Sequence, residues 1–181
     1  MSDKRELDPA QLDSLHVYKI ITGCVVPRPI GFITTVNAAG QVNAAPFSFF
    51  NALSHEPPIV CFAPGKNSKM GIKDTLNNVR VTGEFVANIV DERIVERVNA
   101  CANEFPSDVN ELDVAKLTSV PSKLVRPPRV AESPVNFECK VWRIIDHERL
   151  KAVGRMAGNV YSRTGDLIAL SYDSFNVIPK T

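Results

Sequence analysis

The sequence predicts a mainly β domain with short helices, folded as a small closed or partly open antiparallel barrel. The chain has 181 residues, which suits one domain that buries about 70% of the surface its unfolded form would expose. Residues 31–36 are rich in β-branched and aromatic side chains, and residues 37–40 supply a turn, as in a β-hairpin. Further short apolar runs follow between proline-containing loops. We therefore expect five or six strands with two or three short helices.

The N-terminal part is expected to differ from the rest of the chain. Residues 1–17 are mostly charged and polar, and they predict an arm or lid over a domain that spans residues 18–181. Residues 18–22 predict a short apolar strand. Pro27 and Pro29 each remove an amide donor and favour extended geometry in the preceding residue. Residues 26–29 should therefore lie at a sheet edge or at the start of a strand.

The middle of the chain combines a buried strand with a cationic loop. Residues 59–63 form a continuous apolar run, short enough for a strand that is buried on both sides. A polar, cationic loop follows at residues 64–69. Residues 73–75 then indicate the start of a short helix, with Asp74 as its N-cap and with Leu76 and Val79 facing inward.

The second half of the chain predicts shorter elements. Residues 84–90 alternate as in a strand, and residues 91–103 carry apolar side chains at helical spacing, which predicts an amphipathic helix packed on the barrel. Prolines divide residues 104–134 into short pieces with room for one brief helix. That helix is expected at residues 111–117, and further strands are expected at residues 135–145, 150–153 and 167–172.

Charge and cysteine content exclude several classes of protein. Lysine and arginine number 21 against 20 acidic residues, a net charge of +1. This balance provides no field to hold nucleic acid or an anionic membrane, so neither is an expected partner. The four cysteines are irregularly spaced and three lie in apolar runs, where free cysteine behaves as a small hydrophobe. With no signal peptide and no long apolar run, we expect a soluble, cytoplasmic protein.

The residue types do not favour a nucleophile or a metal centre. His16, His55 and His147 lie in unrelated polar contexts, so solvated or capping histidines are favoured over a Cys/His catalytic pair. Zinc is disfavoured as well, because CxxC, HxH and HExxH are absent from the sequence. Residues 43–51 instead form a rigid segment rich in hydroxyl and amide groups. Such a segment suits a flat aromatic ligand.

A cluster of cations and hydroxyls predicts an anion site close to this segment. The residues are Lys66, Ser68, Lys69, Lys73 and Thr75, at an expected helix start where free backbone amides favour a phosphate. From charge alone, a solvated surface loop is the more common outcome. If residues 59–63 pair beside the hairpin, however, the loop emerges next to residues 43–51, and the two together describe a mononucleotide site. For two of Phe47, Phe49 and Phe50 we expect ordinary burial in the core.

Several motifs resemble the flavin reductase-like, FMN-binding split-barrel family. The sequence PRPIGFITT is followed by G-x-x-N-x-AP-x-S-F-F-N and by a strand led by two prolines. The resemblance continues through KDTLNNVRVTGEFVANIV, VAESPVNFECKV and VGRMAGNVYSR, and so covers most of residues 18–163. It implies a six-stranded Greek-key split β-barrel, a homodimer, and one FMN per subunit near the dimer interface.

The resemblance also implies roles for individual residues. Thr34 and Thr35 would lie beside the flavin ring, and Lys73 and Thr75 would contact the phosphate. Arg155, Asn159 and Tyr161 would close the site, from the same subunit or from its partner. The shelf for the ring would consist of Asn43, Ala45, Pro46, Phe47, Ser48 and Asn51, and further help with the phosphate would come from Lys66, Ser68 and Arg28.

Two function classes follow from a bound flavin. The first is an NAD(P)H-dependent reductase of flavin or of a small electrophile, in which hydride passes from NADH or NADPH to flavin N5 and no catalytic side chain is required. The electrons would then pass to a monooxygenase or another redox protein. The alternative is a non-enzymatic FMN-binding electron-transfer protein, similar to flavoredoxin, that serves a protein partner. A scaffold without cofactor is the least favoured reading.

One departure from the family concerns residues 145–150. Members of the family usually carry a further strand pair between the segment that resembles KVWRII and the segment that resembles LKAVGR, whereas here residues 145–150 join the two directly. Either the hairpin is truly shortened or the given sequence omits a stretch. If the strand is missing, we expect an exposed sheet edge and a thinner wall on the nicotinamide side of the groove. His147 is assigned no role.

Overall fold

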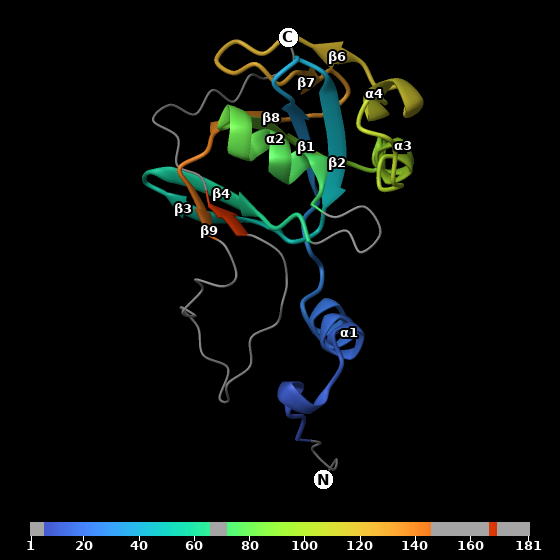
Figure 1. The fold of residues 1–181 in the computed structure, drawn as a ribbon, viewed down its shortest axis with the longest axis vertical. Helices are drawn as coiled ribbons and strands as arrows, with labels where there is room; N and C mark the ends of the chain where they lie inside the picture. The colour runs from blue at the N-terminus through green and yellow to red at the C-terminus, as the bar shows by residue number, and fades with distance from the viewer. Residues whose placement is uncertain (1–5, 66–71, 146–166, 170–181) are drawn as a thin grey trace.

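The computed structural model describes residues 6–65, 72–145 and 167–169. Within these residues the strands form two four-stranded sheets and one two-stranded sheet (Figure 1). The strands are β1 (Gly31–Val36), β2 (Val42–Phe47), β3 (Phe50–His55), β4 (Pro58–Phe62), β5 (Glu84–Ile89), β6 (Ser119–Val120), β7 (Arg129–Val130), β8 (Asn136–Lys140), β9 (Arg143–Ile145) and β10 (Leu167–Ala169). The helices are the 3-10 helix η1 (Pro9–Gln11) and the α-helices α1 (Ser14–Cys24), α2 (Asp74–Thr82), α3 (Val95–Ala100) and α4 (Glu111–Val114).

The first sheet contains the predicted hairpin, which is confirmed. Its strand order is β2-β1-β5-β8, and β1 pairs antiparallel with β2 from Gly31 opposite Phe47 to Val36 opposite Val42. The turn forms because the Asn37 side-chain oxygen accepts bonds from the amides of Ala39 and Gln41. Gly40 adopts a φ of +84° in the same turn, a value that favours glycine.

Helices cover both faces of this sheet. β1 is a central strand, so its alternate side chains enter two different cores. Ile33 lies in one core with Leu76 and Val79 of α2, whose predicted inward orientation is confirmed. Phe32 lies in the other core with residues of α3 and α4, among them Val98. The sheet is therefore covered on both faces, and β2 forms one of its two edges.

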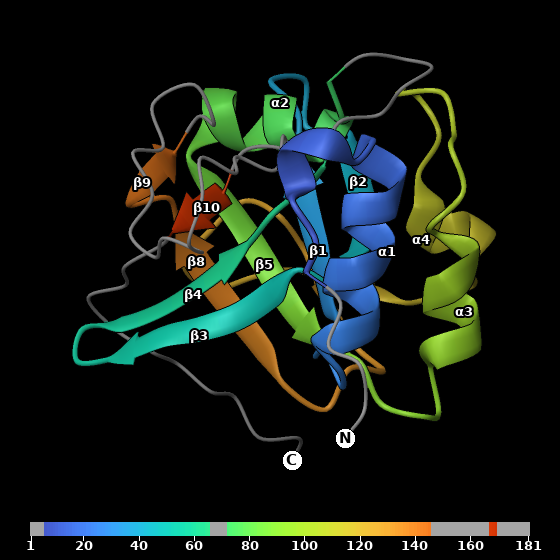
Figure 2. The same ribbon diagram turned by 90° about the horizontal axis from the view of Figure 1, so that it is seen from below.

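The second sheet has the order β3-β4-β10-β9. The buried strand expected at residues 59–63 is present as β4. It pairs with β3 and β10 and not with β1 or β2, and it meets the end of the 43–51 segment where Phe50 lies opposite Phe62 and Asn51 opposite Cys61. Figure 2 shows the β3–β4 hairpin extending away from the first sheet. β2 and β3 are separated only by Ser48 and Phe49. This short bend therefore carries the chain from one sheet to the other.

The N-terminal arm is a helix where the sequence suggested a strand. Residues 18–22 lie in α1, which projects from the body of the molecule (Figure 1). The helix forms because the Asp13 side chain accepts a bond from the His16 amide at 2.9 Å and acts as N-cap. None of its side chains is buried. The expected boundary between residues 17 and 18 falls inside this helix.

Other elements differ in their limits. Lys73, and not Asp74, occupies the N-cap position of α2, so Asp74 is the first helical residue. Two helices are shorter than expected. Of residues 91–103 only those of α3 are helical, and of residues 111–117 only those of α4. The strand expected at residues 135–145 is divided into β8 and β9, which belong to different sheets. The strand expected at residues 150–153 lies outside the described residues, as does the end of that at residues 167–172.

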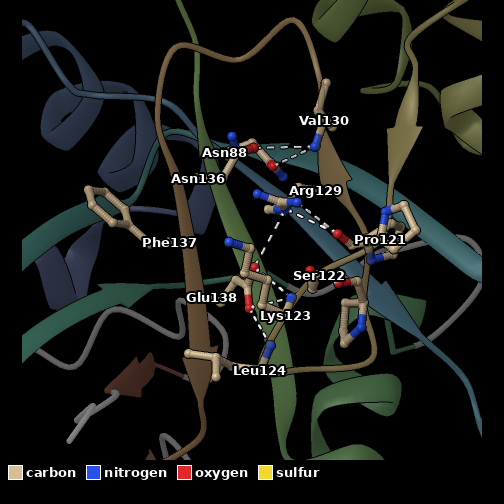
Figure 3. Close-up of polar contacts among 12 residues, drawn as sticks. Asn88, Pro121, Ser122, Lys123, Leu124, Arg129, Val130, Asn136, Phe137 and Glu138 are labelled. Carbon is tan, nitrogen blue, oxygen red and sulfur yellow. Dashed lines mark hydrogen bonds and ion pairs between the residues drawn. The ribbon is translucent and has the colours of Figure 1, made fainter. Parts of the chain in front are cut away.

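A buried carboxylate anchors the loop that precedes β7. Glu138 of β8 accepts bonds from the amides of Lys123 and Leu124 at 2.7–3.0 Å (Figure 3). The Arg129 guanidinium lies 3.5 Å from the same carboxylate and also donates to the Pro121 carbonyl oxygen. These contacts tie residues 121–129 to the first sheet.

The mainly β fold with short helices is confirmed, while the six-stranded Greek-key barrel stays a prediction because the described strands form separate sheets. Across the described residues, no helix has the length and apolar character needed to cross a membrane. In the same residues, no three histidine, cysteine, aspartate or glutamate side chains are grouped so as to hold a metal ion.

Candidate functional site

A pocket of about 450 Å³ lies at the free edge of the first sheet. This volume falls within the range of about 300–1,000 Å³ that is common for small-molecule sites. Three parts of the chain line it: the edge strand β2, the start of α2, and the connection between α3 and α4. The described lining residues are Asn43, Ala45, Pro46, Ile72, Lys73, Asp74, Thr75, Cys101, Ala102, Asn103, Glu104, Phe105, Ser107 and Glu111.

The start of α2 supplies the cationic end of the pocket. The amides in the first turn of a helix have no intrahelical acceptor, and the helix dipole places partial positive charge there. Lys73 adds a full positive charge, with its Nζ atom 5.3 Å from the centre of the Phe47 ring. The Thr75 hydroxyl accepts a bond of 2.9 Å from the Asn43 side-chain amide. Strand β2 and the helix start are therefore held together around this end.

A buried carboxylate, that of Glu111, also lines the pocket. Glu111 is only 8% exposed, and its carboxylate accepts a bond of 2.9 Å from the Ala44 amide at the open edge of β2. Burial raises the pKa of this carboxyl, and the negative charge of Asp74 acts in the same direction. Burial also raises the pKa of the neighbouring Cys101 thiol to about 12, so this cysteine is no nucleophile at neutral pH. An anion is therefore favoured at the Lys73 end of the pocket.

Thr34 and Thr35 lie under the site with no exposed surface. The Thr34 hydroxyl donates a bond of 2.5 Å to the Pro128 carbonyl oxygen, and the Thr35 hydroxyl accepts one of 3.0 Å from the Asn78 side-chain amide. Both are on the central strand β1, which is covered on each face. In this conformation they offer no contact to a ligand, and they fix β1 against its neighbours.

The residues expected to form a shelf follow β2 into the bend and β3. Asn43, Ala45 and Pro46 line the pocket. Ser48 is half-buried in the bend, and Asn51 is exposed, with its side-chain oxygen accepting a bond from the Ala52 amide. The candidate shelf is therefore continuous along the chain but turns away from the pocket at the bend.

The three phenylalanines behave as predicted. Phe47 and Phe50 are 4% and 8% exposed and belong to one core, whereas Phe49 in the bend is half-buried. Two of the three are therefore ordinary core residues. The Phe47 ring packs against that of Phe62 with the ring centres 5.2 Å apart.

Arg28 does not join the pocket. Arg28, expected as a helper for the phosphate, instead donates bonds of 2.6 Å to the carbonyl oxygens of Thr22 and Val25. It is not among the residues that line the pocket. Lys66, Ser68, Arg155, Asn159 and Tyr161 lie outside the described residues, so their expected roles stay predictions.

Sequence reasoning missed the contribution of residues 101–111 to the pocket. Glu111 is the clearest case, because its buried carboxylate satisfies an amide 67 positions earlier in the chain. A local signal existed only for the helix start, where the Asn110 side chain caps the Leu112 amide. Nothing local in the sequence indicates that the adjoining Glu111 turns inward toward β2.

Comparison with known protein families shows to which family this chain belongs. The profile of the family described as "Flavin reductase like domain" matches residues 22–160, well over half of the chain. This chain belongs to the flavin reductase-like family. The resemblance inferred from the motifs is therefore confirmed, and the pocket lies inside the matched region of a flavin reductase-like protein.

A curated relative and two solved structures support this assignment. The uncharacterized protein BH2278 of Halalkalibacterium halodurans is 37% identical over 198 residues, covering 91% of this chain and 95% of that protein. Nitrilotriacetate monooxygenase component B from Bacillus cereus is 30% identical, with a TM-score of 0.83 over 98% of this chain and 83% of that chain. The Pseudomonas fluorescens 2-nitrobenzoate 2-nitroreductase NbaA is also 30% identical, with a TM-score of 0.77 over 96% and 77% of the two chains.

The alignment with BH2278 bears on the expected shortening of this chain. It spans 198 residues, which is more than the 181 residues that this flavin reductase-like chain contains. The relative therefore carries residues that have no counterpart here. The expected position of the shortening, residues 145–150, lies almost wholly outside the described residues.

Proposed function

We propose that this flavin reductase-like protein binds FMN and uses NADH or NADPH to reduce it. The observation that carries the proposal is the family match together with the cationic helix start that adjoins strand β2 in one pocket. A bound flavin supplies the redox chemistry, accepting hydride at N5. The described residues have the tasks of binding and orientation. No acid or base side chain is needed for this transfer.

The donor set at the start of α2 fits a phosphate monoester. The Asp74 and Thr75 amides at the helix start and the Lys73 ammonium favour a dianion, and the Asn43–Thr75 bond fixes the strand relative to the helix. The buried Glu111 carboxylate opposes an anion on its side of the pocket. We propose that the phosphate lies at Lys73 and that the flavin ring lies along the shelf of Ala45 to Asn51, where Asn43 and Ser48 offer hydrogen bonds.

The electron acceptor is proposed to be a monooxygenase or another redox protein. Support comes from the similarity to a protein named as component B of a monooxygenase. The similarity to a nitroreductase supports direct reduction of a small electrophile as a variation of the same chemistry. The alternative, a non-enzymatic electron-transfer protein with tightly bound FMN, differs in one observable: its flavin would not be reduced by a nicotinamide.

We propose a homodimer on separate grounds. A set of apolar side chains on and after α1 and on β3 is 48–63% exposed, and surfaces of this kind mark protein contacts. In Figure 2 α1 and the β3–β4 hairpin both lie on the side of the molecule that is nearest the viewer. The residues are Leu15, Tyr18, Val25, Val26 and Leu53. Light scattering on the purified protein tests this, and replacing Leu15 and Leu53 with lysine should shift a dimer to monomer.

The function is tested by the absorption spectrum of the purified protein and by anaerobic titration. We expect bound or added FMN to show the flavin bands, and NADH or NADPH to bleach them rapidly. Bleaching only by dithionite or by a reduced redox protein would support the electron-transfer alternative. A protein that does not bind FMN at micromolar concentration would contradict both readings.

The phosphate contacts are tested by Lys73→Ala combined with Thr75→Ala. Loss of charge-assisted bonds worth about 1.5–3 kcal/mol should weaken FMN binding about 10- to 100-fold, while riboflavin, which lacks the phosphate, should bind with unchanged affinity. Lys140→Ala removes an exposed lysine of β8 and is the matched control. Equal FMN affinity in the double variant and the control would show that the phosphate binds elsewhere.

A further inference from the structure

Arg28 occupies a position between helix α1 and the candidate shelf. Its Nη1 atom donates to the carbonyl oxygens of Thr22 and Val25, both at 2.6 Å. These carbonyls lie in and just after the last turn of α1, where backbone oxygens lack intrahelical donors and the helix dipole is negative. The guanidinium therefore both caps the C-terminal end of α1 and neutralises its partial charge.

The same guanidinium contacts the bend between β2 and β3. Its central carbon lies 6.0 Å from the centre of the Phe49 ring, in the range of a cation–π interaction. Its Nε atom is 3.5 Å from the Ser48 hydroxyl oxygen. Phe49 also meets Tyr18 of α1 edge to face, with the ring centres 6.3 Å apart. The bend and the helix thus share one guanidinium and one aromatic pair.

These contacts matter because, among the described residues of one subunit, α1 makes few other contacts with the body of the protein. None of its side chains is buried, and an isolated helix of 11 residues is marginal in water. The attachment of α1 to the body should therefore depend on the polar and aromatic contacts around Arg28. A lysine could not replace them, since one ammonium cannot reach two carbonyls while its charge lies over an aromatic ring.

We propose that Arg28 is a positioning residue that couples the attachment of α1 to the geometry of the flavin shelf at Ser48 and Phe49. The proposal rests on the proposed function, because it requires a flavin on that shelf. A ligand that orders the bend also orders the guanidinium and, through it, the end of α1. By reciprocity, a firmly attached α1 favours flavin binding by the same factor.

Cys24, the last residue of α1, offers a direct probe of this coupling. It is exposed, whereas the other three cysteines are buried, so a thiol-specific nitroxide can be attached to it in the otherwise unaltered protein. We expect the electron paramagnetic resonance spectrum of the label to broaden when FMN is added, because the helix end becomes less mobile. In Arg28→Lys the spectrum should be narrow with or without FMN, and FMN should bind about five- to tenfold more weakly.

Two variants separate coupling from a general loss of structure. Arg126→Lys changes an arginine that pairs with Glu84, and it should retain both the FMN-dependent broadening and the wild-type affinity. Phe49→Leu removes the ring while Arg28 remains, and it should lose the broadening as Arg28→Lys does. All variants are compared at the same oligomeric state and with circular dichroism spectra that match the wild type.

The outcomes are distinguishable. If the wild-type protein does not bind FMN, the proposed function fails, and with it the basis of the coupling. If the wild type binds FMN but Arg28→Lys shows the same affinity and the same FMN-dependent broadening, the flavin function stands and the role of Arg28 is wrong. If FMN binds and the label responds only in proteins that retain both Arg28 and Phe49, the coupling is supported.

Discussion

Replacing Glu138 with glutamine should strongly destabilise the protein. The Glu138 side chain is 2% exposed, and its two oxygens accept bonds from the amides of Lys123 and Leu124 while Arg129 lies 3.5 Å away (Figure 3). Glutamine keeps the shape but has one acceptor oxygen, and its NH₂ group would face a backbone amide donor. It also leaves the Arg129 guanidinium, 15% exposed, without its counter-charge.

The magnitude follows from these contacts. Breaking a buried ion pair by removing one partner costs about 3–5 kcal/mol, and a buried hydrogen bond to a charged group contributes about 1.5–3 kcal/mol. Because glutamine retains one acceptor, we expect a loss of about 3 kcal/mol in the free energy of unfolding. For a domain of this size that lowers the melting temperature by about 6–12 °C.

Glu132→Gln provides a matched comparison on a more accessible carboxylate. The Glu132 side chain is 25% exposed and bonds to the amide and hydroxyl of Thr118, so its loss should cost about 1 kcal/mol. Urea unfolding followed by circular dichroism measures both variants. If Glu138→Gln costs no more than Glu132→Gln, the reasoning from burial is refuted.

Three further perturbations test other parts of the structure. Gly31→Ala places a Cβ atom 2.6 Å from the Phe50 ring, and it should cost about 1–3 kcal/mol in urea unfolding, partly restored by Phe50→Leu. Burial raises the pKa of Glu111. At pH values between the ordinary glutamate pKa and this raised pKa, the folded state binds more protons than the unfolded state, so the stability of the wild type falls as the pH rises through this range. In thermal unfolding between pH 4 and 7, the stability of Glu111→Gln should fall less with pH than that of the wild type. Parallel curves of stability against pH for the two proteins would contradict this role of Glu111. Ellman's reagent should modify Cys24 rapidly in the native protein and the three buried cysteines only on unfolding; rapid modification of more than one thiol would contradict the burial.

Local chemistry made part of the fold predictable. The β1–β2 hairpin follows from β-branched residues on either side of a turn that Asn37 and Gly40 specify. α2 follows from a helix start that precedes the apolar positions Leu76 and Val79. In each case the residues that determine the structure lie within about ten positions of one another.

Predictions failed where distant parts of the chain decide the structure. Residues 18–22 are an exception, because nearby groups, the Asp13 cap and the contacts of Arg28, favour a helix although the apolar pattern fits a strand. Residues 135–145 alternate continuously, yet they split into β8 and β9 because the two halves pair with strands of different sheets. The carboxylate side of the pocket was missed for the same reason, since Glu111 reaches β2 only in the folded chain.

The course of the chain between β2 and β3 explains why the fold and the candidate site share residues. Phe47 and Phe50 lie on either side of the bend and are buried in the same core, so the bend between them is fixed at both ends. Ser48 and Phe49 are the residues left outside, facing Arg28. A ring bound on this shelf would therefore meet a bend that core packing holds at both ends. Among the described residues, Ser48, Phe49 and α1 are joined by contacts near the surface. Substitutions in the core should then alter stability first, and substitutions around Arg28 should alter ligand binding first.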